Sequence, residues 1–165
     1  MDTIDKLIDT AELEKALREL GQDVAAGYAS TLMRNDHKAT GELIDSIRAT
    51  VDVDGAVYEV NLHMADYWKY LEEGTSPHWP PRDAILRWIE AKPVIPRPGP
   101  DGRIPSPESL AFLISRKISR EGTKGTHDLE KTTDAIIPYW KERLRDILGR
   151  MWGDYIAKVI SFPTK

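Results

Sequence analysis

Four histidines are the side chains of this sequence best suited to bind a metal ion or to act as a general base. These histidines are His37, His63, His78 and His127. No two of them have the HxH, HxxxH or HExxH spacing that places two ring nitrogens on one metal ion. The chain also lacks cysteine, so neither a disulfide nor a thiolate metal site can form. The sequence therefore predicts no metal site and no cofactor.

Carboxylates and hydroxyls give no clearer catalytic pattern. Glu72 and Glu73 are adjacent, so on a helix they diverge by about 100° and cannot converge on one bond. The glycine-containing run at 121–126 lacks the GxxxxGK[ST] pattern of a phosphate-binding loop. A small hydrolase built on Glu72, Thr75 and His78 is one alternative, but no third group is evident to orient the histidine. We predict that the protein is not an enzyme.

The totals fit a single domain spanning residues 1–165, with 41% apolar and 30% charged residues. A net charge of -4 gives no overall attraction to nucleic acid or to an anionic membrane, although a local basic patch could still bind DNA. The N-terminus is acidic, and no run of 18 apolar residues occurs. We expect neither a secretion signal nor a membrane span, and therefore a protein made in the cytoplasm.

The elements that position these residues begin with an amphipathic helix from about Thr10, a candidate N-cap, to about Met33. Thr40 can cap a second, short helix. From Ile47 the apolar residues alternate, and an Asp54-Gly55 pair separates two such runs. This pattern predicts a β-hairpin at about 47–63 with a type I′ turn.

The centre of the chain is rich in aromatic residues and prolines. Residues 64–73 return to helical spacing, and Gly74 follows where a left-handed cap is expected. Pro80-Pro81 predicts another helix, with a buried stripe of Ala84, Ile85, Trp88 and Ile89. Six prolines and two glycines at 93–107 then predict an extended arm or loop.

Two helical segments are expected after the arm, and the second is either one bent helix or two helices. Ser106 with Pro107 resembles an N-cap followed by proline at the first helical position, and the apolar face would be Leu110, Leu113, Ile114 and Ile118. A longer helical pattern starts near Asp128, where Pro138 must either bend one helix or separate two.

Two clusters of side chains invite a binding function. The four cations Arg116, Lys117, Arg120 and Lys124 form a basic cluster at the end of the 107–121 helix, where cations interact favourably with the helix terminus. They could instead contact DNA or an acidic surface. Aromatic residues crowd the 64–81 region and cannot all point inward, so some should be exposed or packed on another subunit, and a local core is the equal alternative. The subunit interface would include Tyr67, Trp68, Tyr70 and Trp79, with Ile95 and Arg97 of the arm.

Two motifs in a fixed order carry a family resemblance. Residues 40–47 read TGELIDSI, and residues 67–75 read YWKYLEEGT with Pro80-Pro81 after them. With the preceding helix, the hairpin between the motifs and the 110–126 run, the chain resembles the tail-completion or minor tail-component family of long-tailed bacteriophages. The similarity covers about residues 10–126, whereas the proline-rich arm and the long C-terminus exceed the family pattern.

The resemblance implies an α+β fold, with a small, mostly antiparallel sheet flanked by helices. It also implies a structural neck protein that joins head to tail as a homo-oligomeric ring and contacts portal, adaptor, tail terminator or tail tube. Its location would be the virion, after assembly in the bacterial host cytoplasm, with DNA passing nearby and no membrane involved. The 93–107 arm would reach an adjacent subunit or another neck protein. The alternative is a DNA-binding accessory protein that uses the 116–124 cations.

Overall fold

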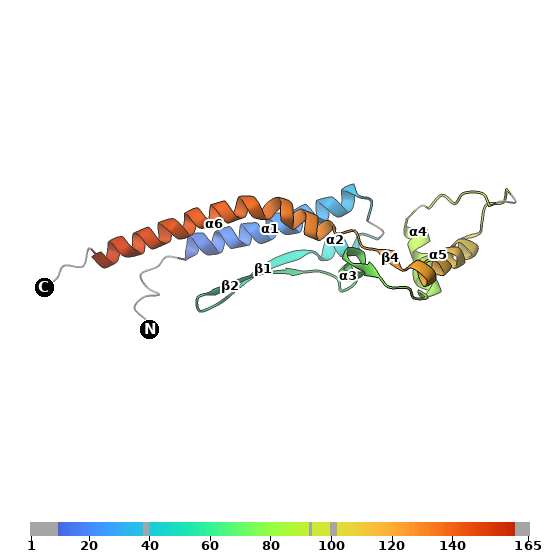
Figure 1. Cartoon of the computed structure of the whole chain (residues 1–165), viewed down its shortest axis with the longest axis horizontal. Coiled ribbons are helices and arrows are strands. Elements are labelled where there is room, and N and C mark those ends of the chain that lie inside the picture. Colours follow the sequence, from blue (N-terminus) through green and yellow to red (C-terminus); the bar gives the residue numbers. More distant parts are fainter. Residues whose placement is uncertain (1–9, 38–39, 93, 100–101, 161–165) are drawn as a thin grey trace. The chain divides into compact units, whose positions relative to one another are not determined.

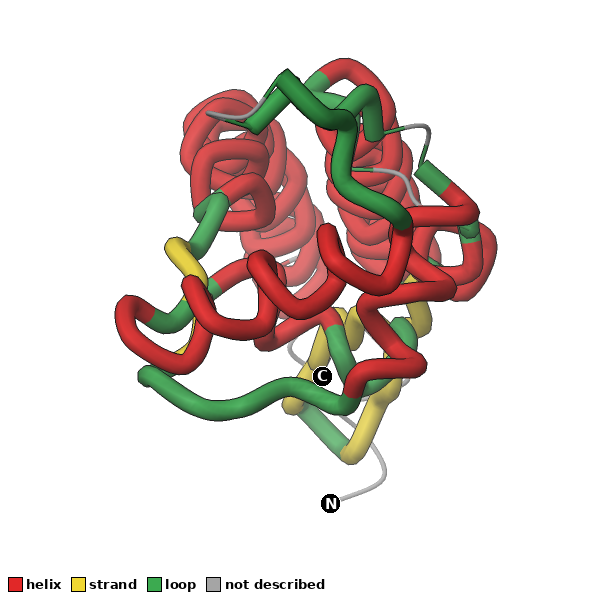
Figure 2. The backbone as a smooth tube through the Cα atoms, turned by 90° about the vertical axis from the view of Figure 1, so that its right-hand side faces the viewer, coloured by secondary structure: helices red, strands yellow, loops and turns green. Residues whose placement is uncertain are grey.

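The computed structural model describes residues 10–37, 40–92, 94–99 and 102–160. It is 63% helical with a two-stranded antiparallel hairpin, a long N-terminal helix and a long C-terminal helix, which confirms the predicted α+β fold. Most of the backbone is helical and the strands are short (Figure 2). The chain divides into two compact units, and a single domain over 1–165 stays a prediction.

The first unit contains the described residues up to Tyr28, then 48–63, and those from 130 onward. Its first helix is α1 (Ala11–Arg34), as the apolar spacing predicts. Thr10 stands at the capping position, because its carbonyl oxygen accepts from the Glu14 amide at 2.9 Å. Its hydroxyl donates to the Glu14 carboxylate at 3.2 Å, a side-chain contact across the first turn of the helix.

The helix α6 (Asp128–Ile160) lies alongside α1 (Figure 1). Polar contacts fix the antiparallel register: Trp140 Nε1 donates to Asp23 at 3.0 Å, Arg143 pairs with Glu19 at 2.6 Å and Arg150 pairs with Glu12 at 2.6 Å. The core between α1 and α6 consists of Leu13, Ala16, Trp140 and Ile147. Pro138 stands inside α6, which is one continuous helix and not two.

The hairpin consists of β1 (Arg48–Asp54) and β2 (Val57–His63), in a register that pairs Val51 with Val60. It packs on α1 at Gly21, where a Cβ would lie 2.8 Å from the Ala49 Cβ. The predicted turn type is wrong. Asp54 pairs with Val57, so the loop residues are Gly55 and Ala56, and of these only Gly55 has positive φ, which matches a type II′ turn.

The second unit contains residues 29–47 and 64–129. Its helix α2 (Glu42–Ser46) begins after Gly41, which has φ of 94° and occupies the capping position expected for Thr40. The Thr40 hydroxyl still accepts from the Glu42 amide at 3.3 Å. Helix α3 (Trp68–Glu72) is shorter than the predicted 64–73, because Ser46 Oγ accepts the Ala65 amide at 2.9 Å and holds the preceding residues outside the helix.

Helices α4 (Arg82–Ala91) and α5 (Pro107–Glu121) pack against each other. The Ser106 hydroxyl accepts from the Ser109 amide at 3.3 Å with Pro107 at the first position, which confirms the predicted cap. The prediction of a buried stripe on α4 is wrong, because no residue of this helix is fully buried and Trp88 is exposed. On α5 the small residues Ala111 and Ser115 are buried, whereas Leu113 is exposed.

Candidate interaction surface

Two short segments that are far apart in sequence meet in the second unit. β3 (Gly74–Thr75) pairs antiparallel with β4 (Thr123–Lys124), with Gly74 opposite Lys124 and Thr75 opposite Thr123. The Thr75 hydroxyl lies 3.0 Å from the Thr123 hydroxyl and accepts the Thr123 amide at 3.2 Å. The loop after α5 is thereby tied to the turn after α3.

Glycines make this close pairing of backbones possible. Gly74 has φ of 79°, as predicted for a left-handed cap, and a Cβ there would collide with the carbonyl oxygen of Thr123. Gly122 has φ of 69°, and a Cβ there would collide with the carbonyl oxygen of Thr75. A side chain at either position would push the two strands apart.

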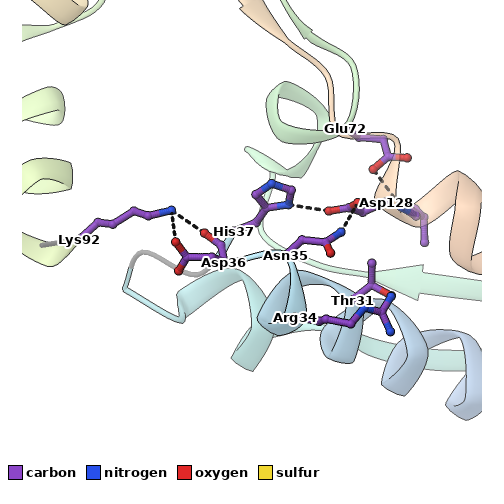
Figure 3. Close-up of polar contacts among 9 residues, drawn as sticks. Thr31, Arg34, Asn35, Asp36, His37, Glu72, Lys92 and Asp128 are labelled. Atoms are coloured by element: carbon purple, nitrogen blue, oxygen red, sulfur yellow. Dashed lines mark hydrogen bonds and ion pairs between the residues drawn. The ribbon is translucent and has the colours of Figure 1, made fainter. Parts of the chain in front are cut away.

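A polar cluster lies next to this strand pair within the second unit (Figure 3). Asp128 is 1% exposed, and its carboxylate contacts His37 Nδ1 at 2.6 Å and accepts from Asn35 Nδ2 at 2.9 Å. The buried Glu72 carboxylate accepts the Leu129 amide at 3.0 Å. Both carboxylates therefore lie at the N-terminus of α6, where negative charge is favourable. Sequence reasoning missed this cluster.

We expect Asp128→Ala to lower the free energy of unfolding by about 3 kcal/mol, because it removes one partner of a buried polar network. Urea denaturation followed by circular dichroism measures the change. Asp134→Ala is the matched control, since Asp134 is an exposed carboxylate on the same helix. Equal effects of the two substitutions would show that the contacts of Asp128 do not stabilise the fold.

The residues of the hydrolase alternative have separate partners. Glu72 accepts from the Leu129 amide, Thr75 contacts Thr123, and exposed His78 places Nδ1 2.9 Å from the Ser76 carbonyl oxygen. His37 resembles a general base oriented by Asp128, but it makes no hydrogen bond to a hydroxyl nucleophile within the described ranges. Neither arrangement is an assembled catalytic triad.

An open groove of about 940 Å³ runs over the second unit. Its apolar lining comes from α2, from α3 and the residue before it, and from α4, and includes Leu43, Ile44, Tyr67, Tyr70, Ile85 and Trp88. Tyr70 is 65% exposed, and Tyr67 is also exposed. Burial and the neighbouring Glu42 carboxylate raise the pKa of the Tyr67 hydroxyl, while a hydrogen bond with the Leu43 backbone lowers it. The Tyr67 phenol therefore stays neutral at physiological pH.

The predicted interface residues do not form one patch. Tyr67 and Tyr70 line the 940 Å³ groove, and Trp68 is half-buried. Trp79 lies at a different groove with Phe112, where the ring centroids are 5.9 Å apart. Ile95 and Arg97 are exposed on the arm. Their participation in an interface stays a prediction. Trp88 was missed because helical spacing assigned it to a buried stripe.

All four residues of the basic cluster are exposed. Arg116, Lys117 and Arg120 belong to α5, and Lys124 belongs to β4 and lines the 940 Å³ groove. Within the part of the chain that the structure describes, none of the four forms an ion pair. The cluster can therefore contact an anionic partner without first breaking a salt bridge.

No group of three or more metal-binding side chains occurs among residues 10–37, 40–92, 94–99 and 102–160. Over the same residues, no helix combines the length and the apolar character needed to cross a membrane. Comparisons with protein-family models, with curated proteins and with solved structures found no match for this chain.

Proposed function

We propose that this chain is a structural subunit of the neck of a long-tailed bacteriophage, a tail-completion protein that joins head to tail in a homo-oligomeric ring. The observation that carries the proposal is the set of exposed aromatic side chains around the 940 Å³ groove, which residues of both motifs of the family resemblance line. The partners would be neck proteins on the portal or tail side, and the location would be the virion after assembly in the host cytoplasm.

The chemistry of the groove supports protein binding. Large aromatic residues bury much apolar area with little loss of side-chain entropy, and tyrosine and tryptophan dominate interface hot spots. Tyr67 and Tyr70 both line the groove and are exposed, and Trp88 adds an exposed indole. Residues of the short β3–β4 pair also line this groove. Such an aromatic surface suits a contact between subunits.

We expect Tyr70→Ala to weaken binding to the cognate neck partner by about tenfold, because an exposed aromatic anchor is lost. Biolayer interferometry with purified portal, adaptor, tail terminator and tail-tube proteins measures the affinity. Tyr139→Ala is the matched control, since Tyr139 on α6 is 63% exposed and Tyr70 is 65% exposed. Binding that is equally strong with both variants would exclude the groove as the contact surface.

A DNA-binding accessory protein is the second candidate function. The exposed cations of α5, which form no ion pair among the described residues, favour it. We expect the purified protein, if it binds DNA, to give a gel shift that weakens as salt increases. Replacing Arg116, Lys117 and Arg120 together with alanine should then abolish the shift, and an unchanged shift would rule out this site.

A further inference from the structure

A second groove, of about 440 Å³, lies on the second unit and is called here the Trp79 groove. Its lining is Trp79, Arg82, Glu108, Ser109, Phe112, Leu113 and Ser115. The rings of Trp79 and Phe112 are tilted by 58°, and their centroids are 5.9 Å apart. Both rings are more than half exposed. An exposed pair of large aromatic rings in a concave site is typical of a surface that binds a partner.

The rim of the Trp79 groove also carries charge. The Glu108 backbone amide and the Ser106 hydroxyl hydrogen-bond to the Glu108 carboxylate, and with the nearby Arg82 they keep the pKa of this carboxyl below its usual value. Glu108 is therefore ionised at neutral pH. A partner that fits this groove should combine apolar residues that pack on aromatic rings, such as proline, with a cation that can lie near Glu108.

The proline arm, residues 94–99 and 102–106, has this chemistry. Ile95 is 91% exposed, and Arg97 stands exposed between Pro96 and Pro98. Two described segments of the arm are joined by a hydrogen bond, since the Gly99 amide donates to the Arg103 carbonyl oxygen at 2.8 Å. Prolines preset an extended backbone, so an arm of this kind loses little conformational entropy when it binds.

We propose that the proline arm of one copy binds in the Trp79 groove of a second copy. Ile95 and the flanking prolines would pack on the Trp79 and Phe112 rings, and Arg97 would pair with Glu108. Aromatic-lined grooves are a general means of binding extended proline-rich segments. The arm does not fill the groove of its own copy, because Ile95 is almost fully exposed. This inference rests on the proposed role in assembly and assigns it one specific contact.

The arm and the groove are different surfaces of the chain, so each subunit uses its arm toward one neighbour and its groove toward the other. A contact of this heterologous kind closes into a ring when the rotation between subunits permits it. The proposed contact is therefore compatible with a ring of identical subunits.

The first test titrates the full-length protein into a fluorescently labelled peptide of residues 92–106 and records anisotropy. We expect saturable binding that Trp79→Ala or Phe112→Ala weakens by about tenfold or more. Trp152→Ala is the matched control, because Trp152 and Trp79 are 58% and 57% exposed. A peptide with Arg97→Glu should bind poorly to the natural chain and better to the Glu108→Arg variant. Absence of binding, or equal binding by the Trp79 and Trp152 variants, would overturn the proposal.

The second test decides whether the arm acts between copies. A chain lacking residues 95–104 is mixed with the Trp79→Ala chain, so that only one arm and one groove remain intact in each pair. Sedimentation velocity should then show a one-to-one complex that neither chain forms alone. A peptide that binds while the mixture stays uncomplexed would overturn the proposed contact between copies. Loss of neck-protein binding with an intact mixed complex would remove the proposed function and leave this contact in place.

Discussion

Trp140→Ala is expected to lower the free energy of unfolding by about 3–5 kcal/mol, the usual loss when a buried tryptophan is truncated. Trp140 is 1% exposed and belongs to the core between α1 and α6. Its indole also donates to Asp23 at 3.0 Å, and the Arg143 guanidinium lies 4.5 Å from the ring centroid. The substitution therefore removes apolar packing, a hydrogen bond and a cation–π contact together.

Urea denaturation monitored by circular dichroism measures this loss, and Trp152→Ala supplies the control. Trp152 stands on the same helix but is 58% exposed, and its ring contact is with Tyr155 at 5.8 Å. We expect a change of about 0.5 kcal/mol or less for this exposed site. If the two substitutions shifted the midpoint equally, the α1–α6 core would not be centred on Trp140.

Gly74→Ala should destabilise the second unit by about 2–5 kcal/mol. A left-handed backbone conformation costs an alanine about 1–2 kcal/mol, and forcing atoms into filled space costs about 1–3 kcal/mol more. The new Cβ would meet the Thr123 carbonyl and lie 2.6 Å from the Gly125 amide nitrogen. These are backbone atoms, so they cannot move aside as a flexible side chain would. Hydrogen exchange of the Thr123 amide should report the opening of the β3–β4 pair.

Gly102→Ala separates the conformational cost of a left-handed backbone from the steric cost of the new Cβ. Gly102 also lies in the second unit and has φ of 73°, but nothing lies within 4 Å of its Cβ position. It should therefore show only the conformational term of about 1–2 kcal/mol. A Gly74 variant no less stable than the Gly102 variant would contradict the close approach of the strands.

Local patterns were enough to predict the elements whose own residues decide them. Apolar spacing predicted α1, and alternation predicted the hairpin, both of which the structure confirms. The turn type was wrong because the sequence does not show which dipeptide the strand register places in the loop. Helix α3 was predicted too long because the Ser46 hydroxyl, 19 residues away from Ala65, holds its amide outside the helix.

Long-range contacts of short segments could not be predicted. β3 and β4 have two residues each, too few to show a period, and Thr75 and Thr123 are 48 residues apart. His37 and Asp128 are separated by 91 residues, and neither belongs to a sequence motif that indicates a contact between them. The exposed aromatics were expected, but sequence reasoning treated them as one group, whereas the structure assigns Tyr70 and Trp79 to different grooves.

Native mass spectrometry of the purified chain, alone and mixed with portal, adaptor, tail terminator and tail-tube proteins, tests the proposed neck function. The proposal predicts a complex that contains several copies of this chain bound to at least one of these proteins, and loss of that complex with Tyr70→Ala but not with Tyr139→Ala. A chain that stays monomeric with every neck protein, and that shifts DNA in a salt-dependent manner, would contradict it and favour the accessory DNA-binding role.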